Sequence, residues 1–255
     1  MKRLFLVILI CLLAACAKKQ VDVSSPTAVE SAEWQKMVDL SAAASNSPWK
    51  TQFSLRFGTE GDTRRVTGIM WGNNNEDIRM DIMAGIGAII ARIEENGPEF
   101  TLFVPQQNKA YTHTGASPLF RIGVPVPFDL PKFAQLLSGN YTGIFGTAFS
   151  GVETASPEKT TYKLEDNSDA SLTLNEKGQP VIWKESRNGW QMTISYDEDG
   201  NDLPKKITLE RPDGKRAILL VKERTTDVAP FTAAQMKLDL PSGISLLPLA
   251  QYAPK

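Results

Sequence analysis

The most regular feature of the chain is an alternation of apolar and polar residues that recurs in short segments from Trp49 onward. In 49–57 the larger apolar residues occupy odd positions, a period of two that is typical of a strand with one buried face. Similar segments follow, separated by short stretches with Gly, Asn or Pro, as in an antiparallel meander. The expected strands are 49–57, 65–71, 78–82, 88–94, 100–104, 109–113, one at Tyr162, 172–174, 181–183, 190–196, 206–210 and 216–223, followed by a last apolar segment, 236–249.

Two segments have a helical period instead. In 31–45, Trp34 and Met37 fall on one face, which predicts a short amphipathic helix before the first strand. In 130–138 the apolar residues also share one face, with Asp129 placed as an N-cap and Gly139 as a C-cap. The Gly-, Ser- and Thr-rich stretch 140–158 carries no clear period, so no element is predicted there.

Many short antiparallel strands indicate a barrel or a sandwich. The helical interruption in the middle of the meander favours a strongly curved antiparallel sheet that forms an incomplete β-barrel of about eleven strands. The two helices are expected to cover the concave face, because a large bare apolar surface is rare unless it binds something. A packed β-sandwich is the alternative.

The N-terminus has a different pattern. Lys2 and Arg3 precede an unbroken apolar run, 4–13, which ends in Leu13-Ala14-Ala15-Cys16. Positive charge, a short apolar core and small residues before a cleavage point predict a secretory signal peptide over 1–15. The run is shorter than the roughly 20 apolar residues that span a bilayer. The polar stretch 16–30 is expected to be a flexible tether, and 31–255 one folded domain.

Charge and cysteine content narrow the function classes. The formal net charge is −1 and no basic patch dominates the sequence, so nucleic-acid binding is not suggested. Cys11 lies in the apolar run and Cys16 at its end, and these are the two cysteines of the chain. We therefore expect no disulfide and no Cys-based metal site in the domain.

The stretch that ends at Cys16 resembles the lipobox of bacterial lipoproteins, in which the cysteine is acylated and becomes the first residue of the mature protein. An ordinary signal peptide with a chance cysteine is the alternative. Ala17 follows, whereas Asp at this place tends to retain lipoproteins in the inner membrane. The resemblance implies anchoring at Cys16 in the outer membrane, facing the periplasm. Two or more acyl chains give stable anchoring.

The order of the other motifs resembles the LolA/LolB family of lipoprotein carriers and acceptors. The matching segments are the helix with Trp34, the strand start at Trp49, 68–71, 122–127 leading into 136–139, and 203–209. The resemblance implies an incomplete barrel with a helical lid over an apolar cavity. The lipobox makes the chain more similar to the outer-membrane acceptor, LolB, than to the soluble carrier.

The resemblance also implies a passive function, in which an apolar cavity takes up the acyl chains of lipoproteins or lipids and helps insert lipoproteins into the outer membrane. A LolA-like periplasmic carrier is the implied partner. Ile86, between Gly85 and Gly87, matches an exposed apolar residue that helps pass the lipid to the membrane; a hairpin turn with Ile86 folded inward is the alternative. The expected cavity residues are Trp71, Ile78, Met80, Ile82, Phe100, Leu102, Trp183, Met192 and Ile194, with Phe133 and Leu137 in the lid.

No catalytic constellation is apparent. The single histidine, His113, has no Cys or second His with which to bind zinc, and no Gly-x-Ser-x-Gly motif accompanies it. We therefore expect no enzyme activity and no cofactor. The alternative function is that of a structural or assembly lipoprotein of the envelope, with the same fold, a packed interior and no lipid transfer.

Overall fold

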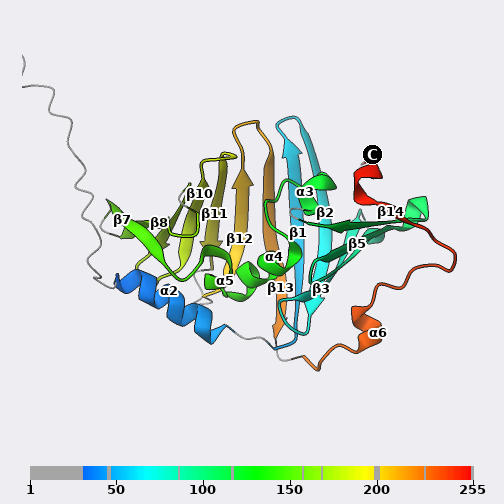
Figure 1. Cartoon of the computed structure of the whole chain (residues 1–255), viewed down its shortest axis with the longest axis horizontal. Coiled ribbons are helices and arrows are strands. Elements are labelled where there is room, and N and C mark those ends of the chain that lie inside the picture. Colours follow the sequence, from blue (N-terminus) through cyan, green and yellow to red (C-terminus); the bar gives the residue numbers. More distant parts are fainter. Residues whose placement is uncertain are drawn as a thin grey trace, which may run out of the picture.

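The computed structural model describes residues 31–44, 47–85, 87–115, 118–156, 158–167, 169–197, 202–226 and 228–253. Cys16, the signal peptide, the tether and Ile86 lie outside these ranges, so the expectations about them stay predictions. The described chain folds around one 14-stranded sheet, which curves strongly but is not closed into a barrel (Figure 1). The predicted fold class, a curved antiparallel sheet that forms an incomplete barrel, is confirmed.

The elements follow one another in two runs of strands with short helices between them. The first run contains α2 (Ala32–Ala43), β1 (Trp49–Thr59), β2 (Asp62–Gly72), β3 (Asp77–Ala84), β4 (Ala88–Asn96), β5 (Glu99–Val104), η2 (Pro105–Gln107) and β6 (Lys109–Thr114). The helices α3 (Pro118–Arg121), α4 (Leu130–Ser138) and α5 (Thr142–Phe145) come next. The second run contains β7 (Phe149–Ser156), β8 (Lys159–Leu164), β9 (Ala170–Asn175), β10 (Pro180–Glu185), β11 (Trp190–Tyr196), β12 (Pro204–Glu210) and β13 (Arg216–Thr226). The C-terminal elements are α6 (Ala233–Met236), β14 (Leu246–Pro248) and η3 (Leu249–Gln251).

The strand order is β14-β6-β5-β4-β3-β2-β1-β13-β12-β11-β10-β9-β8-β7. The first strand, β1, lies inside the sheet and pairs with β2 on one side and with β13 on the other, both antiparallel. Each run of strands is a meander that ends at a different edge of the sheet. As a consequence β6 lies next to one edge strand, and β7 is the strand at the other edge.

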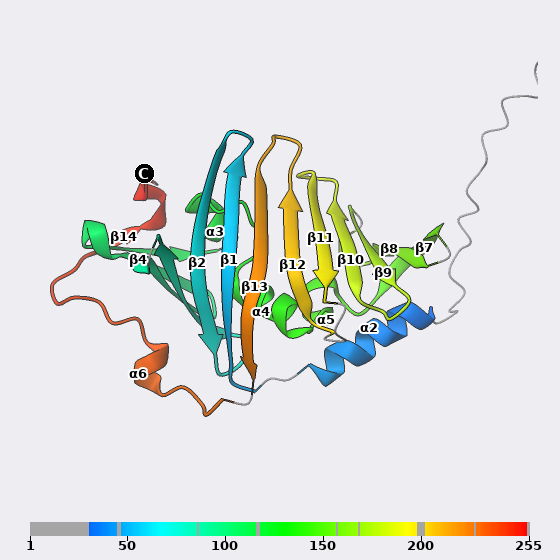
Figure 2. The same ribbon diagram turned by 180° about the vertical axis from the view of Figure 1, so that it is seen from behind.

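The segment that connects β6 to β7 crosses the concave face of the sheet. In Figure 1, α4 and α5 lie in front of the strands, and in Figure 2, seen from the opposite side, they lie behind them. We call residues 118–146, which include α3, α4 and α5, the lid segment. The sequence sets the limits of α4: the Asp129 side chain accepts a hydrogen bond from the Lys132 backbone N–H at 2.9 Å, and Gly139 has a φ of 85°. Both predicted caps of this helix are confirmed.

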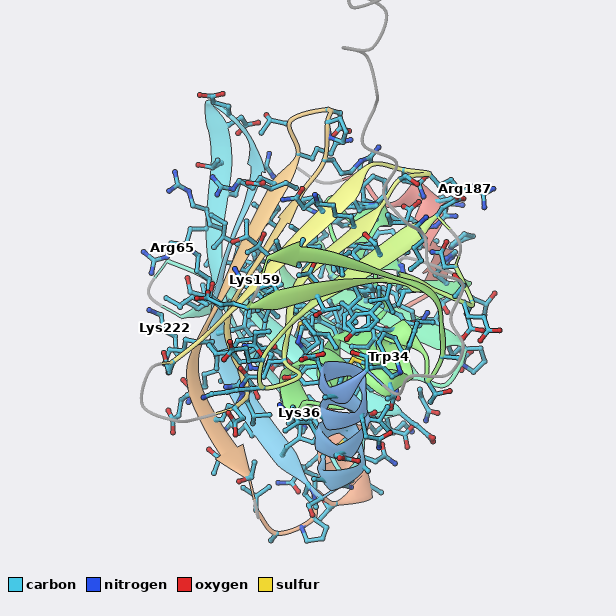
Figure 3. All side chains as sticks on the ribbon, turned by 90° about the vertical axis from the view of Figure 1, so that its left-hand side faces the viewer. Trp34, Lys36, Arg65, Lys159, Arg187 and Lys222 are labelled. Atoms are coloured by element: carbon cyan, nitrogen blue, oxygen red, sulfur yellow. The ribbon has the colours of Figure 1, made fainter. Side chains whose placement is uncertain are left out.

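The helix α2 lies along the lower end of the sheet, where Trp34 points toward the second run of strands (Figure 3). The Trp34 ring packs against Phe149 at 4.9 Å and against Tyr162 at 5.0 Å between ring centroids. Trp34, Met37 and Ser41 are the buried side chains of this helix. The helix thus covers the end of the half-barrel rather than the middle of its concave face.

The C-terminal arm, residues 228–253, runs from β13 to the far edge of the sheet. There β14 pairs with β6, the one parallel pairing described in this sheet. On its way the arm packs Leu238 against Phe103 and Ala110, which form a small apolar cluster separate from the main core. None of the helices in the described ranges is long and apolar enough to cross a membrane.

The strand number differs from the sequence-based expectation of about eleven. The strand β7 lies in the stretch for which no element was predicted, and its pairing with β8 is interrupted by two irregularities in register. The strand β14 has three residues and exists only because the arm reaches β6. Neither strand has the period of two that identified the others.

The centre of the sheet is packed tightly enough to require a glycine. A Cβ added to Gly68 on β2 would lie 2.3 Å from the ring of Phe53, a buried side chain on β1. No real Cβ approaches another atom so closely, so the ring can occupy its place only because residue 68 has no side chain.

We expect Gly68→Ala to lower the free energy of unfolding by about 1–3 kcal/mol, the usual cost of overpacking. Gly151→Ala on β7 is the control, because its nearest new contact would be an ordinary 3.6 Å to the Lys163 side chain. Urea denaturation of both variants measures the effect. Equal stabilities would contradict the tight packing of Phe53 against residue 68.

Candidate functional site

An apolar cavity of about 110 Å³ lies between the concave face and the lid segment. Each of its sixteen lining residues is apolar or aromatic, and none carries a charge: Phe53, Leu55, Phe57, Val66, Met80, Ile82, Ile90, Ala91, Ile93, Leu119, Ile122, Val124, Val126, Phe133, Leu219 and Tyr252. The strands β1–β4 and β13 supply its floor, the lid segment supplies its roof, and Tyr252 of the C-terminal arm also lines it. Such a space accepts hydrocarbon and excludes ions.

The roof is held to the sheet mainly by apolar contact. The side chains of Leu119, Ile122, Val124 and Val126 all line the cavity. The backbone hydrogen bonds given for residues 118–126 in the described chain stay within that stretch, as in Val124 N–H to Leu119 C=O at 3.0 Å. Lifting this part of the lid segment would therefore expose apolar surface without breaking backbone hydrogen bonds to the sheet.

The helix α4 is fixed more firmly, through polar contacts at both of its ends. At its N-terminus the backbone N–H of Leu130 donates to the carboxylate of Glu95 on β4 at 2.9 Å. At its C-terminus the Asn75 side-chain amide donates to the Ser138 hydroxyl at 3.2 Å. Burial raises the pKa of the Glu95 carboxyl to about 7, although the Leu130 N–H acts in the opposite direction.

The apolar cavity adjoins an open mouth of about 500 Å³ at the upper end of the sheet. The two spaces share Phe57, Val66, Ile90, Ile122 and Tyr252. The mouth lies between the β1–β2 hairpin and the start of the lid segment, and its lining adds the charged residues Asp62, Arg64 and Lys215. A molecule with a polar head and an apolar tail would fit with its head in the charged mouth and its tail in the apolar cavity.

A second opening, the aromatic groove, lies on the concave side near the upper ends of β10 and β11 and has a volume of about 640 Å³. Its apolar floor includes Phe128 and Trp183, whose ring centroids are 5.5 Å apart. Its polar lining residues are Lys132, Asp166, Asn167, Glu185, Arg187, Asn188 and Arg211. The groove has the size of typical ligand pockets, about 300–1,000 Å³.

Phe120 of α3 separates the aromatic groove from the mouth, since it lines both. The Arg211 guanidinium lies 5.4 Å from the centroid of Phe120 and 5.2 Å from that of Trp190. The Lys215 ammonium lies 5.4 Å from the same Phe120 ring. These cation–π contacts attach α3 to the β12–β13 hairpin from outside the cavity.

The structure distributes the predicted cavity residues over several places. Met80, Ile82 and Phe133 line the apolar cavity. Trp183 lines the aromatic groove, and Leu137 lines a space of about 240 Å³ between the ends of α2 and α4. The others belong to the packed core around them: Ile78, Phe100, Leu102, Met192 and Ile194. Their contact with a ligand stays a prediction.

Trp71 lies on the other face of the sheet. Met70 is fully buried in the core, so its neighbour on β2 points to the convex side. The Trp71 ring packs there against Phe231 of the C-terminal arm, 6.4 Å between centroids, and under the Arg79 guanidinium at 5.4 Å. Trp71 therefore does not line the apolar cavity.

Sequence reasoning missed the roof of the cavity. Ile122, Val124 and Val126 alternate with Gly123 and Pro125, which is a period of two inside a proline-rich stretch. We interpreted the prolines as an interruption of the meander, although this alternation was a usable signal of a one-sided apolar segment. In the residues that the structure describes, no group of three or more His, Cys, Asp or Glu side chains could hold a metal ion.

No protein-family model and no curated protein matches the sequence. Among solved structures, a LolA superfamily protein from Nitrosomonas europaea has a TM-score of 0.55 at 13% identity, covering 77% of this chain and 94% of that one. A domain from Vibrio parahaemolyticus, described as an outer membrane lipoprotein-sorting protein domain, has a TM-score of 0.52 at 7% identity, covering 80% and 95%. At these identities the likeness is one of fold: the chain has the fold of a LolA superfamily protein.

The Glu95 contact with α4 predicts a pH dependence of stability. Because its pKa is about 7 in the folded protein and about 4.5 in the unfolded chain, the folded state holds more protons between these values. The free energy of unfolding should therefore fall as the pH rises from about 4.5 to about 7. Glu95→Gln keeps an oxygen for the Leu130 N–H but does not ionise. Relative to wild type it should gain on the order of 3 kcal/mol between pH 4.5 and pH 8.

Urea denaturation of both proteins at these two pH values measures the difference. The variant should come close to wild type at the lower pH, where Glu95 is protonated in the folded protein and half protonated in the unfolded chain. An identical change of stability with pH in both proteins would contradict the assignment of this titration to Glu95.

Proposed function

We propose that the protein is a lipid-anchored envelope lipoprotein that binds acyl chains in the apolar cavity and helps to receive lipoproteins at the outer membrane or insert them into it. The apolar cavity carries this proposal, because its sixteen lining residues are uncharged and its roof is held mainly by apolar contact. The shared fold with an outer membrane lipoprotein-sorting protein domain supports it. A soluble LolA-like carrier is the proposed donor of the acylated client.

The volume of the cavity determines how binding would occur. At about 110 Å³ the closed cavity is smaller than typical ligand pockets of about 300–1,000 Å³. An acyl chain would have to lift residues 118–126 and so join the cavity to the mouth. The cost is the loss of apolar contacts, which the chain itself replaces. The passive mechanism therefore needs no catalytic group.

The small closed volume also favours the alternative, a structural or assembly lipoprotein of the envelope with a packed interior. In that case the lid segment stays closed and the surface of the protein binds partners. The two proposals differ in one measurable property, the uptake of an acyl chain.

A cavity-filling substitution tests the first proposal. Wild type should bind a fluorescent fatty acid at micromolar concentration. Ala91→Leu places a larger side chain in the cavity and should weaken binding at least tenfold, because little space remains for the chain. Ala88→Leu, on the same strand but exposed, is the matched control and should bind like wild type. Titration by fluorescence measures the affinities.

Circular dichroism must show that both variants are folded, since overpacking can cost about 1–3 kcal/mol. The absence of any uptake by wild type would overturn the lipid-binding proposal and favour the structural one. Equal affinities of the two variants would indicate that the acyl chain binds outside the apolar cavity.

Acylation at Cys16 is proposed as the anchor, and it can be tested separately. Cys16→Ser should abolish the incorporation of labelled palmitate, because the serine hydroxyl does not replace the thiol that takes the diacylglyceryl group. Cys11→Ser removes the other cysteine, from within the apolar run, and should leave the labelling intact. Metabolic labelling followed by fractionation of the membranes measures both. Labelling that persists in Cys16→Ser would disprove the lipobox assignment.

A further inference from the structure

The convex face of the sheet is divided into a covered and an uncovered half. The C-terminal arm packs against the outward side of β2–β6, where Phe231 contacts Trp71 and Leu238 contacts Phe103. In Figure 2, β2, β1, β13, β12 and β11 face the viewer, with the helices of the lid segment behind them. We call the outward side of β8–β13, of β1 and of the part of β2 that the arm leaves uncovered the basic face, for the reason given next.

The strand registers place nine cationic side chains on the basic face and only two carboxylates. The cations are Lys50, Arg56, Arg65, Lys159, Lys163, Lys184, Lys206, Arg216 and Lys222. Figure 3 shows Arg65, Lys159 and Lys222 along one side of the molecule. The carboxylates are Glu210, which pairs with Arg216 at 2.9 Å, and Glu223, which accepts a hydrogen bond from Gln52 at 3.1 Å. Lys163 has a partner of its own, and two carboxylates can neutralise at most two of the other eight cations.

This imbalance is a property of the face and not of the chain, whose formal net charge is −1. The covered half of the convex side shows no such excess. There Arg79 and Arg92 lie 3.6 and 3.9 Å from the Asp81 carboxylate, and Glu94 accepts a hydrogen bond from the Leu238 backbone N–H. The excess of positive charge is not apparent in the sequence, because the nine cations are spread from residue 50 to residue 222. They lie on one face only once the strands have paired into the sheet.

One arrangement on the basic face acts against stability. Arg56 and Arg65 lie directly opposite each other on β1 and β2, and like charges in such pairs destabilise a sheet. Their guanidinium groups are turned to hydroxyls instead, Arg65 to Ser54 at 3.1 Å and Arg56 to Thr63 at 3.2 Å. A charge pattern that folding alone does not favour points to a binding role.

The composition of the basic face indicates the kind of partner. Protein interfaces are enriched in aromatic residues and depleted in Lys, whereas the basic face is rich in Lys, Thr and Ser. Its only outward aromatic residue in the described strands β8–β13, β1 and β2 is Trp71, which the C-terminal arm already contacts. Long-range attraction to an anionic lipid surface needs no apolar anchor and contributes about 1 kcal/mol per Lys or Arg near the surface.

We propose that the basic face binds the anionic surface of a lipid bilayer. The eight strands span about 34 Å at about 4.8 Å per strand, wide enough to cover several lipid headgroups. Because the face is convex, only its centre can touch the lipid headgroups. The cations at its margins attract the headgroups through the solution, over distances up to the Debye length of about 8–10 Å. This attraction is independent of acyl binding in the apolar cavity and of any anchor at Cys16.

The test is co-sedimentation of the full chain carrying Cys16→Ser with vesicles of phosphatidylcholine alone or mixed with phosphatidylglycerol. The apolar run 4–13 can associate with either vesicle, so the readout is the ratio of binding to the anionic over the neutral vesicles. The ratio should be well above one at about 0.01 M salt and approach one at about 1 M, where the Debye length is about 3 Å.

Replacing Lys184, Lys206 and Lys222 by Gln should lower that ratio by between tenfold and a hundredfold. The matched control replaces three exposed lysines elsewhere, Lys36, Lys109 and Lys177, and should leave the ratio unchanged. Both triple variants should retain fatty-acid uptake, so that a failure here is distinct from a failure of the proposed function. A ratio near one for the starting protein at low salt, or an equal loss in both triple variants, would overturn the proposal. Tighter binding to a DNA duplex than to the anionic vesicles at the same salt would overturn it as well.

Discussion

The pairing of β1 with β13 determines the arrangement of the whole molecule. It joins the first and last long strands of the meanders at the centre of the sheet, so the two meanders grow outward in opposite directions. The strands β6 and β7 then lie twelve strand positions apart, a path of about 58 Å along the curved sheet at about 4.8 Å per strand. The chain between them has to cross one face of the sheet, and the chain after β13 crosses the other. The roof of the cavity and the C-terminal arm are both consequences of this one pairing.

The two faces of the sheet carry different chemistry because successive side chains of a strand point to opposite sides. On the concave side the curvature leaves an apolar space that the lid segment fills incompletely, and the polar contacts of Glu95 and Asn75 hold only α4. On the convex side the arm covers one half and leaves the other half to solvent. The inward side chains therefore determine the volume of the apolar cavity, and the outward side chains determine the charge of the convex surface. A substitution on one side can change its property without changing the other.

Much of the fold could be predicted from local patterns. The alternation in 49–57 and its successors identified the strands, and Asp129 with Gly139 identified the limits of α4. The site was harder to predict, because it depends on which face of each strand points inward and on which segment covers it. Trp71 illustrates the first difficulty: its place in a strand was clear, but Met70, not Trp71, occupies the inward position. Val124 and Val126 illustrate the second, since they contact strands more than thirty residues away in sequence. The basic face required the register of eight strands, which no single segment contains.

The lid segment is attached to the sheet at both of its ends, through β6 on one side and β7 on the other. A lid that is attached at one end can rotate away from the sheet as a whole. A lid that is attached at both ends can only move outward in its middle part. Movement of such a strap is greatest along its free margins, which here face the mouth and the aromatic groove. A long chain molecule would therefore slide in lengthwise under one margin, and molecules with a bulky end would keep that end outside. If the cavity binds acyl chains as proposed, the topology of the sheet would select them by shape before any side chain contacts them.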